Sequence, residues 1–150
     1  MSTATLNGVE LYYEIMGTGS KLFLTHGSWT DGSGWAQLAE LLADRYEVVT
    51  WDRRGHSRSA DTDEPGSRTE DATDLAALIE YLGDLPVHLL GNSYGATVTL
   101  TVVTQRPDLV ASAVLHEPPL FTLLEDTSDP AILEALATSE DRLDAVAKFI

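Results

Sequence analysis

Residues 87–95 read Val-His-Leu-Leu-Gly-Asn-Ser-Tyr-Gly, and this stretch decides the fold. Its apolar start is typical of a buried strand, and small residues follow it. Residues 91–95 have the form G-x-S-x-G, which between a strand and a helix makes a turn so tight that the central side chain stands free. The two glycines are needed because any Cβ there would collide with the neighbouring strand and helix. Ser93 is therefore the leading candidate for a covalent nucleophile.

On its own, this pattern has a plain alternative, a glycine-rich turn that carries a solvated serine. G-x-S-x-G arises by chance in roughly one chain in twenty of this length, given average glycine and serine usage. The rest of the sequence has to decide between a nucleophile and a surface loop.

Short apolar or alternating runs predict strands over the first 115 residues. Residues 9–15 are the clearest case, because polar and apolar side chains alternate there between two glycines. Asn7-Gly8 predicts a hairpin turn just before this run. The predicted strands are residues 3–6, 9–15, 21–25, 46–51, 87–90 and 110–115.

Helix patterns occupy the gaps between these strands. Residues 35–42 carry an apolar helical face, and Ser67-x-x-Glu70 has the form of a capping box before a second apolar stripe. Residues 97–102 alternate locally like a strand, but the tight turn before them requires a helix and Pro107 stops it. We therefore expect a buried helix there. Alternating strands and helices predict an α/β fold, a mostly parallel sheet with helices on both faces.

Composition excludes several classes of partner. The 150 residues include 24 acidic and 9 basic side chains, for a net charge of −15. Such a surface repels phosphate backbones and anionic lipids, so we expect neither nucleic acid nor membrane as a partner. The chain has no Cys, which excludes a disulfide framework and a thiolate metal site. The first residues do not resemble a signal peptide, and no apolar run could span a bilayer. A cytoplasmic protein is the default expectation.

Two further motifs follow predicted strands. Residues 26–29 read His-Gly-Ser-Trp, and residues 52–59 read Asp-Arg-Arg-Gly-His-Ser-Arg-Ser. With G-x-S-x-G they form an ordered set that resembles the serine-nucleophile branch of the α/β-hydrolase superfamily. Its H-G-x, D-x-R-G-x-G-x-S and G-x-S-x-G motifs follow strands three, four and five. The second loop departs from that pattern, because the glycine expected at His56 is missing. The resemblance covers residues 1 to about 119.

The resemblance implies roles for three residues. Ser93 matches the nucleophile, and the backbone N–H groups of Ser28 and Tyr94 match the two donors of an oxyanion hole. Attack on an ester carbonyl builds negative charge on oxygen, and two fixed amide donors about 3 Å away stabilise that charge. Neither donor uses its side chain, so Ser28→Ala should matter little. Dehalogenases and epoxide hydrolases of this fold carry Asp in place of Ser93, so these activities are disfavoured. No cofactor and no metal are implied.

The base that should activate Ser93 is missing. In this fold the order is Ser, then Asp or Glu, then His, and the only later His is His116, at the end of the sixth predicted strand. Glu117 could be the triad acid that some relatives place there, although a role in the pocket or cap hinge is preferred. For His26 we favour a structural role over direct catalysis. Trp29 could line an acyl pocket or pack in the core.

The end of the sequence predicts a longer protein. Residues 132–136 resemble the start of a helical cap, and an apolar stripe over 143–150 has no helix terminator. Relatives have eight strands and six are predicted here. We therefore expect residues 1–119 to be the N-terminal part of a hydrolase core and residues 120–150 the start of the cap, truncated after about strand six.

Three functional hypotheses follow. The first is a serine hydrolase that cleaves an ester or related acyl substrate, a small molecule, through an acyl-enzyme on Ser93. The second is an impaired fragment or a binding module of the same fold, because the triad His is absent. The third is completion by a separate chain, since an uncovered sheet edge favours self-association.

Overall fold

The computed structural model describes residues 2–62 and 66–120. The chain divides into two compact units, Met1–Pro119 and Leu120–Ile150. Apart from Leu120, the second unit lies outside the described residues. The predicted cap helix at 132–136 and the apolar stripe over 143–150 therefore lie outside them too.

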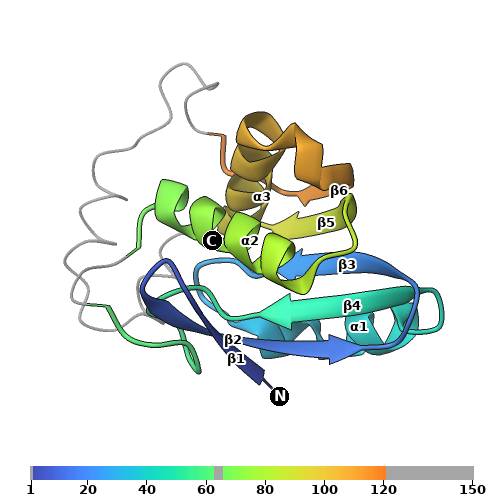
Figure 1. The fold of residues 1–150 in the computed structure, drawn as a ribbon. Coiled ribbons are helices and arrows are strands. Elements are labelled where there is room, and N and C mark those ends of the chain that lie inside the picture. The colour runs from blue at the N-terminus through green and yellow to red at the C-terminus, as the bar shows by residue number, and fades with distance from the viewer. Residues whose placement is uncertain (1, 63–65, 121–150) are drawn as a thin grey trace. The chain divides into compact units, whose positions relative to one another are not determined.

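The first unit is built on a six-stranded sheet with strand order β1-β2-β4-β3-β5-β6 (Figure 1). The parallel strands are β3, β4, β5 and β6, whereas β2 pairs antiparallel with both β1 and β4. The prediction of a mostly parallel sheet is confirmed. The strands are β1 Ser2–Leu6, β2 Val9–Met16, β3 Ser20–Thr25, β4 Tyr46–Trp51, β5 Val87–Asn92 and β6 Val110–His116.

Helices cover both faces of this sheet, as predicted. Alternate side chains of each strand point to opposite faces. Phe23 joins the large apolar cluster under α2 and α3, whereas Leu22 and Leu24 join a smaller cluster under α1. Figure 1 shows α1 on the side of the sheet away from α2 and α3. The helices are α1 Ala36–Leu42, α2 Arg68–Leu82 and α3 Tyr94–Gln105, with 3₁₀ turns η1 Gly32–Trp35 and η2 Pro107–Leu109.

The predicted capping box at the start of α2 is present. The Ser67 hydroxyl accepts a hydrogen bond from the Glu70 N–H, and the Glu70 carboxylate accepts one from the Ser67 N–H. Residues 97–102 lie inside α3, so the expected buried helix is confirmed against the local strand-like alternation. Their threonines remain compatible with a helix because Thr101 donates its hydroxyl hydrogen back to the Thr97 carbonyl at 2.8 Å.

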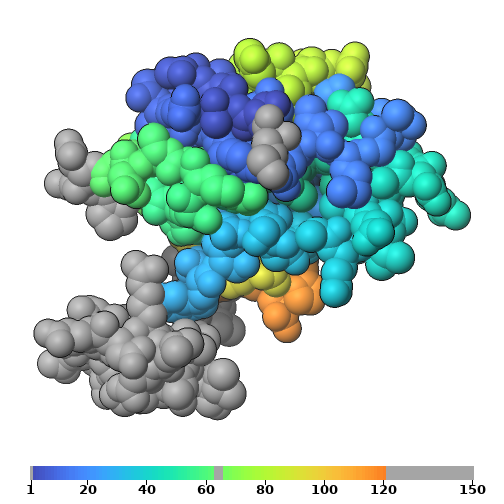
Figure 2. Space-filling model, turned by 90° about the horizontal axis from the view of Figure 1, so that it is seen from below, coloured from blue at the N-terminus to red at the C-terminus, as the bar shows by residue number. Residues whose placement is uncertain are grey.

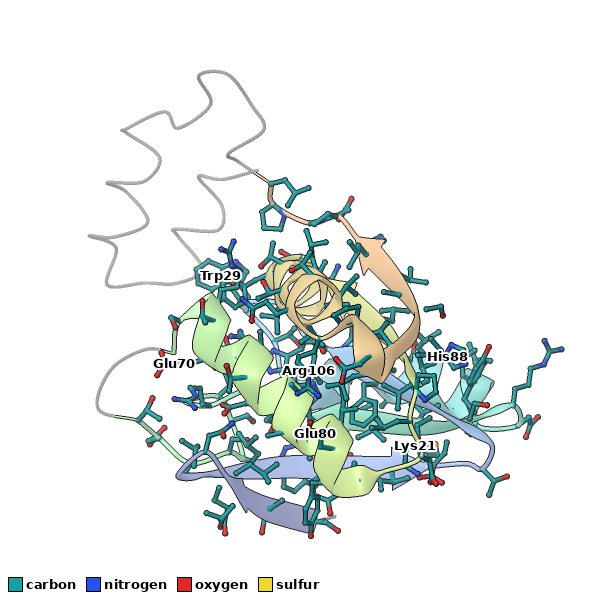
Figure 3. All side chains as sticks on the ribbon, turned by 45° about the horizontal axis from the view of Figure 1, so that its top comes forward. Lys21, Trp29, Glu70, Glu80, His88 and Arg106 are labelled. Carbon is teal, nitrogen blue, oxygen red and sulfur yellow. The ribbon has the colours of Figure 1, made fainter. Side chains whose placement is uncertain are left out.

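The loops that follow the parallel strands meet at one edge of the sheet. Figure 3 places Trp29 at the same end as Glu70, near the start of α2, with Lys21 and His88 at the opposite end. In Figure 2 the surface of the segment near residue 30, in light blue, lies between that of the loop at 53–62, in green, and that of β6, in orange. Carboxyl ends of parallel strands are where α/β folds place their sites.

Candidate active site

Ser93 lies at the sharp turn between β5 and α3. Its backbone has φ 51° and ψ −124°, a conformation that is rare for a residue with a side chain. The surroundings hold it there from both sides. The Ser93 N–H donates to the His116 carbonyl at 2.9 Å, and the Ser93 carbonyl accepts from the Ala96 N–H at 2.9 Å. Strain of this kind persists only where neighbouring structure fixes it, and it is typical of functional sites.

The two glycines beside Ser93 are required by space. A Cβ on Gly91 would overlap the Gly95 carbonyl and stand 2.5 Å from Thr99 Oγ1. A Cβ on Gly95 would overlap the carbonyl oxygens of Thr25 and His26. The structure thus confirms the steric reason that the sequence suggested for the G-x-S-x-G pattern.

His26 holds the loop that follows β3. Its ring is fully buried; Nδ1 lies 2.8 Å from the Gly27 carbonyl oxygen, and Nε2 accepts from the Arg53 N–H at 3.0 Å. These partners assign a neutral ring with the proton on Nδ1. Burial, with the nearby Arg53 charge, lowers the pKa of His26 to about 4. Both nitrogens are engaged, which favours the structural role over direct catalysis.

The loop after His26 packs directly against the sharp turn at residues 91–95, which we call the elbow. A methyl group on Gly27 would stand 3.3 Å from Ser93 Cβ, so Gly27 and Ser93 lie in contact. Among the described residues, no acceptor binds the N–H of Ser28 or that of Tyr94. Tyr94 also begins α3, whose amino end carries partial positive charge. One of these two donors thus belongs to the residue after Ser93, and the other to the residue after Gly27, which contacts Ser93.

The second motif is tied down by Asp52, which is fully buried. Its Oδ1 accepts from the Gly32 N–H at 2.7 Å, and its Oδ2 accepts from Arg58 Nε at 2.7 Å. Asp52 thus anchors the far end of its loop and the start of η1. The glycine position of this loop needs a correction: the positive φ angles fall on Gly55, at 66°, and on Ser57, at 48°, and not on His56. Ser57 keeps this conformation while its hydroxyl donates to Asp31 at 2.8 Å.

Two buried ion pairs behind this loop were missed by sequence reasoning. Arg53 pairs with Asp71 at 2.8 Å, and Arg54 pairs with Asp74 at 2.7 Å. Both carboxylates are fully buried on α2. A usable signal was present: the two acids lie three residues apart on the same helix face as the apolar stripe of α2, and charged residues in such a stripe need partners.

The remaining candidate residues lie nearer to solvent. Trp29 is 61% exposed beside Ser28, which excludes core packing for this side chain. Glu117 follows β6 with φ 50°, and its side chain is 80% exposed. His116 Nδ1 lies 2.8 Å from Asn92 Nδ2. All four histidines of the sequence lie among the described residues, and none of them hydrogen-bonds the Ser93 side chain.

A cavity of about 370 Å³ opens beside the elbow, on the α1 face of the sheet. Its lining comes from the segment at 30–35, which includes η1, and from α1, β5 and β6, and Ser93 is not part of it. Trp35 contributes to its wall while packing against the α1 cluster. The lining includes Trp35, Leu38, Leu90, Asn92, Val114 and His116.

No cluster of three or more acidic or histidine side chains suited to a metal ion is found within residues 2–62 and 66–120. None of the helices in these ranges combines the length and apolar character needed to cross a bilayer.

The sequence is similar to those of known hydrolases. Residues 22–149 match the model of the alpha/beta hydrolase family. The chain belongs to this family. The uncharacterized hydrolase YraK of Bacillus subtilis is 36% identical over 124 residues, which cover 81% of this chain and 46% of that protein. The bifunctional esterase/perhydrolase DCH of Acinetobacter calcoaceticus is 34% identical over 131 residues, 83% of this chain and 48% of that protein.

A solved hydrolase has the same fold as this family member. The alpha/beta hydrolase from Sphaerobacter thermophilus superposes with a TM-score of 0.82 at 31% identity, covering 99% of this chain and 58% of that one. The present chain thus spans about half the length of the curated hydrolases it matches.

Proposed function

We propose that this hydrolase-family chain carries the nucleophile and oxyanion hole of a serine hydrolase that cleaves a small ester or related acyl substrate. The observation behind the proposal is that Ser93 is held at φ 51° in a glycine-crowded elbow that Gly27 contacts, and that the N–H groups of Tyr94 and Ser28, the residues after Ser93 and Gly27, have no acceptor among the described residues. A serine in that setting is placed for attack on a carbonyl group.

The reaction proceeds in two steps. Ser93 Oγ attacks the carbonyl carbon while a general base removes its proton, and the carbonyl oxygen becomes an oxyanion that accepts from the Ser28 and Tyr94 N–H groups. Collapse of this intermediate breaks the bond to the alcohol, which leaves with the proton. Water then attacks the acyl-enzyme by the same route, releasing the carboxylic acid and restoring Ser93.

The base in this scheme comes from outside the chain. None of the four histidines hydrogen-bonds the Ser93 side chain, so in this proposal a further part of the full-length protein, or a partner chain, supplies the imidazole that activates Ser93. Glu117 follows β6 at the same sheet edge and stays a candidate for the triad acid or for a pocket wall. Trp29, exposed beside Ser28, is a candidate wall of the acyl pocket.

Ester cleavage is favoured over other acyl chemistry by one relative. DCH of Acinetobacter calcoaceticus is described as an esterase/perhydrolase, and it is 34% identical to this chain. The excess of acidic residues, with a net charge of −15, favours neutral or cationic substrates over anionic ones.

A fluorophosphonate probe tests the proposal. The full-length protein should be labelled at Ser93, Ser93→Ala should abolish the labelling, and Ser28→Ala should preserve it because only the Ser28 main chain takes part. A folded full-length protein that the probe leaves unlabelled would overturn the proposal.

A second candidate function is binding without turnover, which is favoured for the chain by itself because none of its four histidines hydrogen-bonds the Ser93 side chain. Loss of a triad member leaves about 10³–10⁴-fold acceleration over the uncatalysed rate, a small remnant of full activity. Residues 1–150 alone should therefore hydrolyse p-nitrophenyl esters near background. Fast hydrolysis by this chain would exclude the binding role.

A further inference from the structure

We propose that Arg53 is a positioning residue that holds both candidate oxyanion-hole donors in place from the interior of the protein. The inference rests on the proposed function, because it concerns the same Ser28 and Tyr94 N–H groups. Arg53 touches neither substrate nor reacting atoms; it acts through the two segments that carry the donors.

The Arg53 guanidinium is buried and held by several contacts. The residue is 3% exposed, and NH1 donates to Asp71 Oδ2 at 2.8 Å. Asp71 is fully buried on α2, a 15-residue helix that packs on the sheet. The second amino group, NH2, lies 2.9 Å from His56 Nε2. A planar guanidinium held by an ion pair at one nitrogen and an imidazole at the other keeps a single orientation.

The first donor segment is fixed through the Gly27 carbonyl. This oxygen accepts from Arg53 NH2 at 3.2 Å and from the His26 ring at 2.8 Å. The Gly27 carbonyl and the Ser28 N–H belong to one planar trans peptide unit, in which the two groups point in opposite directions. Two hydrogen bonds that fix the oxygen on the buried side therefore also fix the direction of the Ser28 N–H on the other side.

The second donor segment is fixed through the Tyr94 ring. The guanidinium carbon of Arg53 lies 4.6 Å from the ring centroid, within cation–π distance. The Tyr94 side chain leaves the backbone directly beside the Tyr94 N–H at the start of α3. One buried cation thus joins the loop after β3 to the first residue after the nucleophile.

Arg54 forms a comparable ion pair with α2 but contacts neither of the two donor segments. It pairs with Asp74 through Nε at 2.7 Å and through NH2 at 2.8 Å, and NH1 reaches Glu70 at 3.0 Å. None of these contacts involves Gly27 or Tyr94. The two pairs link the same loop to the same helix, so they differ mainly in what the arginine holds.

Precise placement of these donors matters for rate. Removing one oxyanion-hole donor from a serine hydrolase costs about 10²–10³-fold in kcat, and a misplacement of about 1 Å can cost about 10²-fold. Loss of Arg53 should therefore lower kcat and leave KM nearly unchanged, because the donors act on the oxyanion more than on the bound substrate.

The experiment compares two double variants of the full-length protein, R53M/D71L and R54M/D74L. Each replaces one buried ion pair by apolar side chains and leaves no buried charge without a partner; the Glu70 carboxylate that loses Arg54 in R54M/D74L is half exposed. Active sites are counted by complete fluorophosphonate labelling, and kcat per labelled site is measured with a p-nitrophenyl ester. R53M/D71L should lose about 10²-fold in kcat with KM within threefold, whereas R54M/D74L should keep the wild-type kcat per site. Arg53→Lys keeps the charge but not the planar guanidinium with its several N–H donors, and it should lose about tenfold in kcat per labelled site. It is the test variant if R53M/D71L misfolds.

Equal kcat per labelled site in R53M/D71L, R53K and wild type would overturn the inference. Failure of the proposed function has a different signature, absence of Ser93 labelling in the wild type. In that case the backbone order of the Ser28 amide, measured by ¹⁵N relaxation, still decides the role of Arg53. An order parameter that falls from about 0.85 to below about 0.6 in R53M/D71L, but not in R54M/D74L, supports it, and an unchanged value excludes it.

Discussion

Gly27 packs against Ser93 so closely that a methyl group on Gly27 would stand 3.3 Å from Ser93 Cβ. The same methyl group would stand 3.4 Å from the Asn92 carbonyl oxygen and from Asn92 Oδ1. The loop after β3 and the elbow after β5 therefore meet at van der Waals distance.

Gly27→Ala should fold and lose reactivity. The Gly27 backbone has no positive φ, so alanine meets only crowding, and the strained elbow has to give by a few tenths of an ångström. We expect the rate of fluorophosphonate labelling at Ser93 to fall about tenfold, in keeping with the sensitivity of attack to geometry. Gly8→Ala is the control, because an added Cβ there meets nothing within 4 Å and costs about 1–2 kcal/mol of backbone strain alone. Labelling of G27A at the wild-type rate would refute the expectation.

Gly95→Ala should be far more damaging to stability. The added Cβ would overlap two main-chain carbonyl oxygens, those of Thr25 and His26, which cannot rotate away. Overpacking against rigid neighbours costs about 3 kcal/mol or more. Urea unfolding followed by circular dichroism measures this loss. Gln105→Ala, at the exposed end of α3, should change the free energy of unfolding by less than about 0.5 kcal/mol. Similar stabilities for G95A and Q105A would contradict the steric account.

Much of the fold was predictable because local pattern and long-range packing agree. Each buried strand is a short apolar run, and the start of α2 follows from a capping box that acts within four residues. Residues 97–102 are the informative exception. Their alternating Thr and Val favour a strand locally, and only the requirement for a helix after the elbow gives the observed α3.

The site was predictable only where a residue type encodes its own geometry. Glycines at 91 and 95 indicate that neighbouring main-chain atoms lie too close for a Cβ, so the elbow could be inferred from the sequence. The place of Asp71 in the apolar stripe of α2 indicates that this carboxylate needs a partner. The partner Arg53 lies 18 positions away in a loop, and no local pattern identifies it. Ser57 likewise hides its positive φ, because only glycine would have revealed it.

His26 should make the protein less stable in mild acid. Its pKa is lowered to about 4 in the folded state by burial, against about 6.5 when unfolded. Between these pH values His26 binds a proton in the unfolded chain but not in the folded chain. The free energy of unfolding therefore keeps the full His26 contribution above pH 6.5 and falls as the pH drops toward 4. The shift corresponds to about 3 kcal/mol.

Urea unfolding at pH 7 and pH 4.5 checks the His26 effect. His26→Asn lowers stability at both pH values, but it should remove most of the difference between them. His88→Asn, on a half-buried ring whose Nδ1 lies 2.8 Å from Ser112 Oγ, should keep the wild-type difference. If H26N keeps the wild-type difference in free energy of unfolding between pH 7 and pH 4.5, groups other than His26 cause the acid sensitivity.

For the Arg54–Asp74 pair, removing one of the two charges should destabilise the protein more than removing both. Asp74 accepts from Arg54 and also from Asn7 Nδ2 at 2.9 Å, so it ties the β1–β2 hairpin to α2. Asp74→Leu leaves the guanidinium without its buried partner and should cost about 3–5 kcal/mol, whereas R54M/D74L removes both charges and should cost less. Urea unfolding of both variants decides, and a double variant less stable than D74L would contradict this reasoning.

Residues 1–150 on their own should self-associate through β6. Among the described residues β6 pairs with β5 on one side only, and Val114 on it is 57% exposed. An unpaired apolar edge is a template for pairing with a second copy, and a lysine placed on it opposes that pairing. Light scattering coupled to size exclusion should show dimers or larger species that Val114→Lys reduces. Leu41→Lys, at a more exposed position on α1, should leave them unchanged, and a monomeric wild-type chain would exclude pairing at this edge.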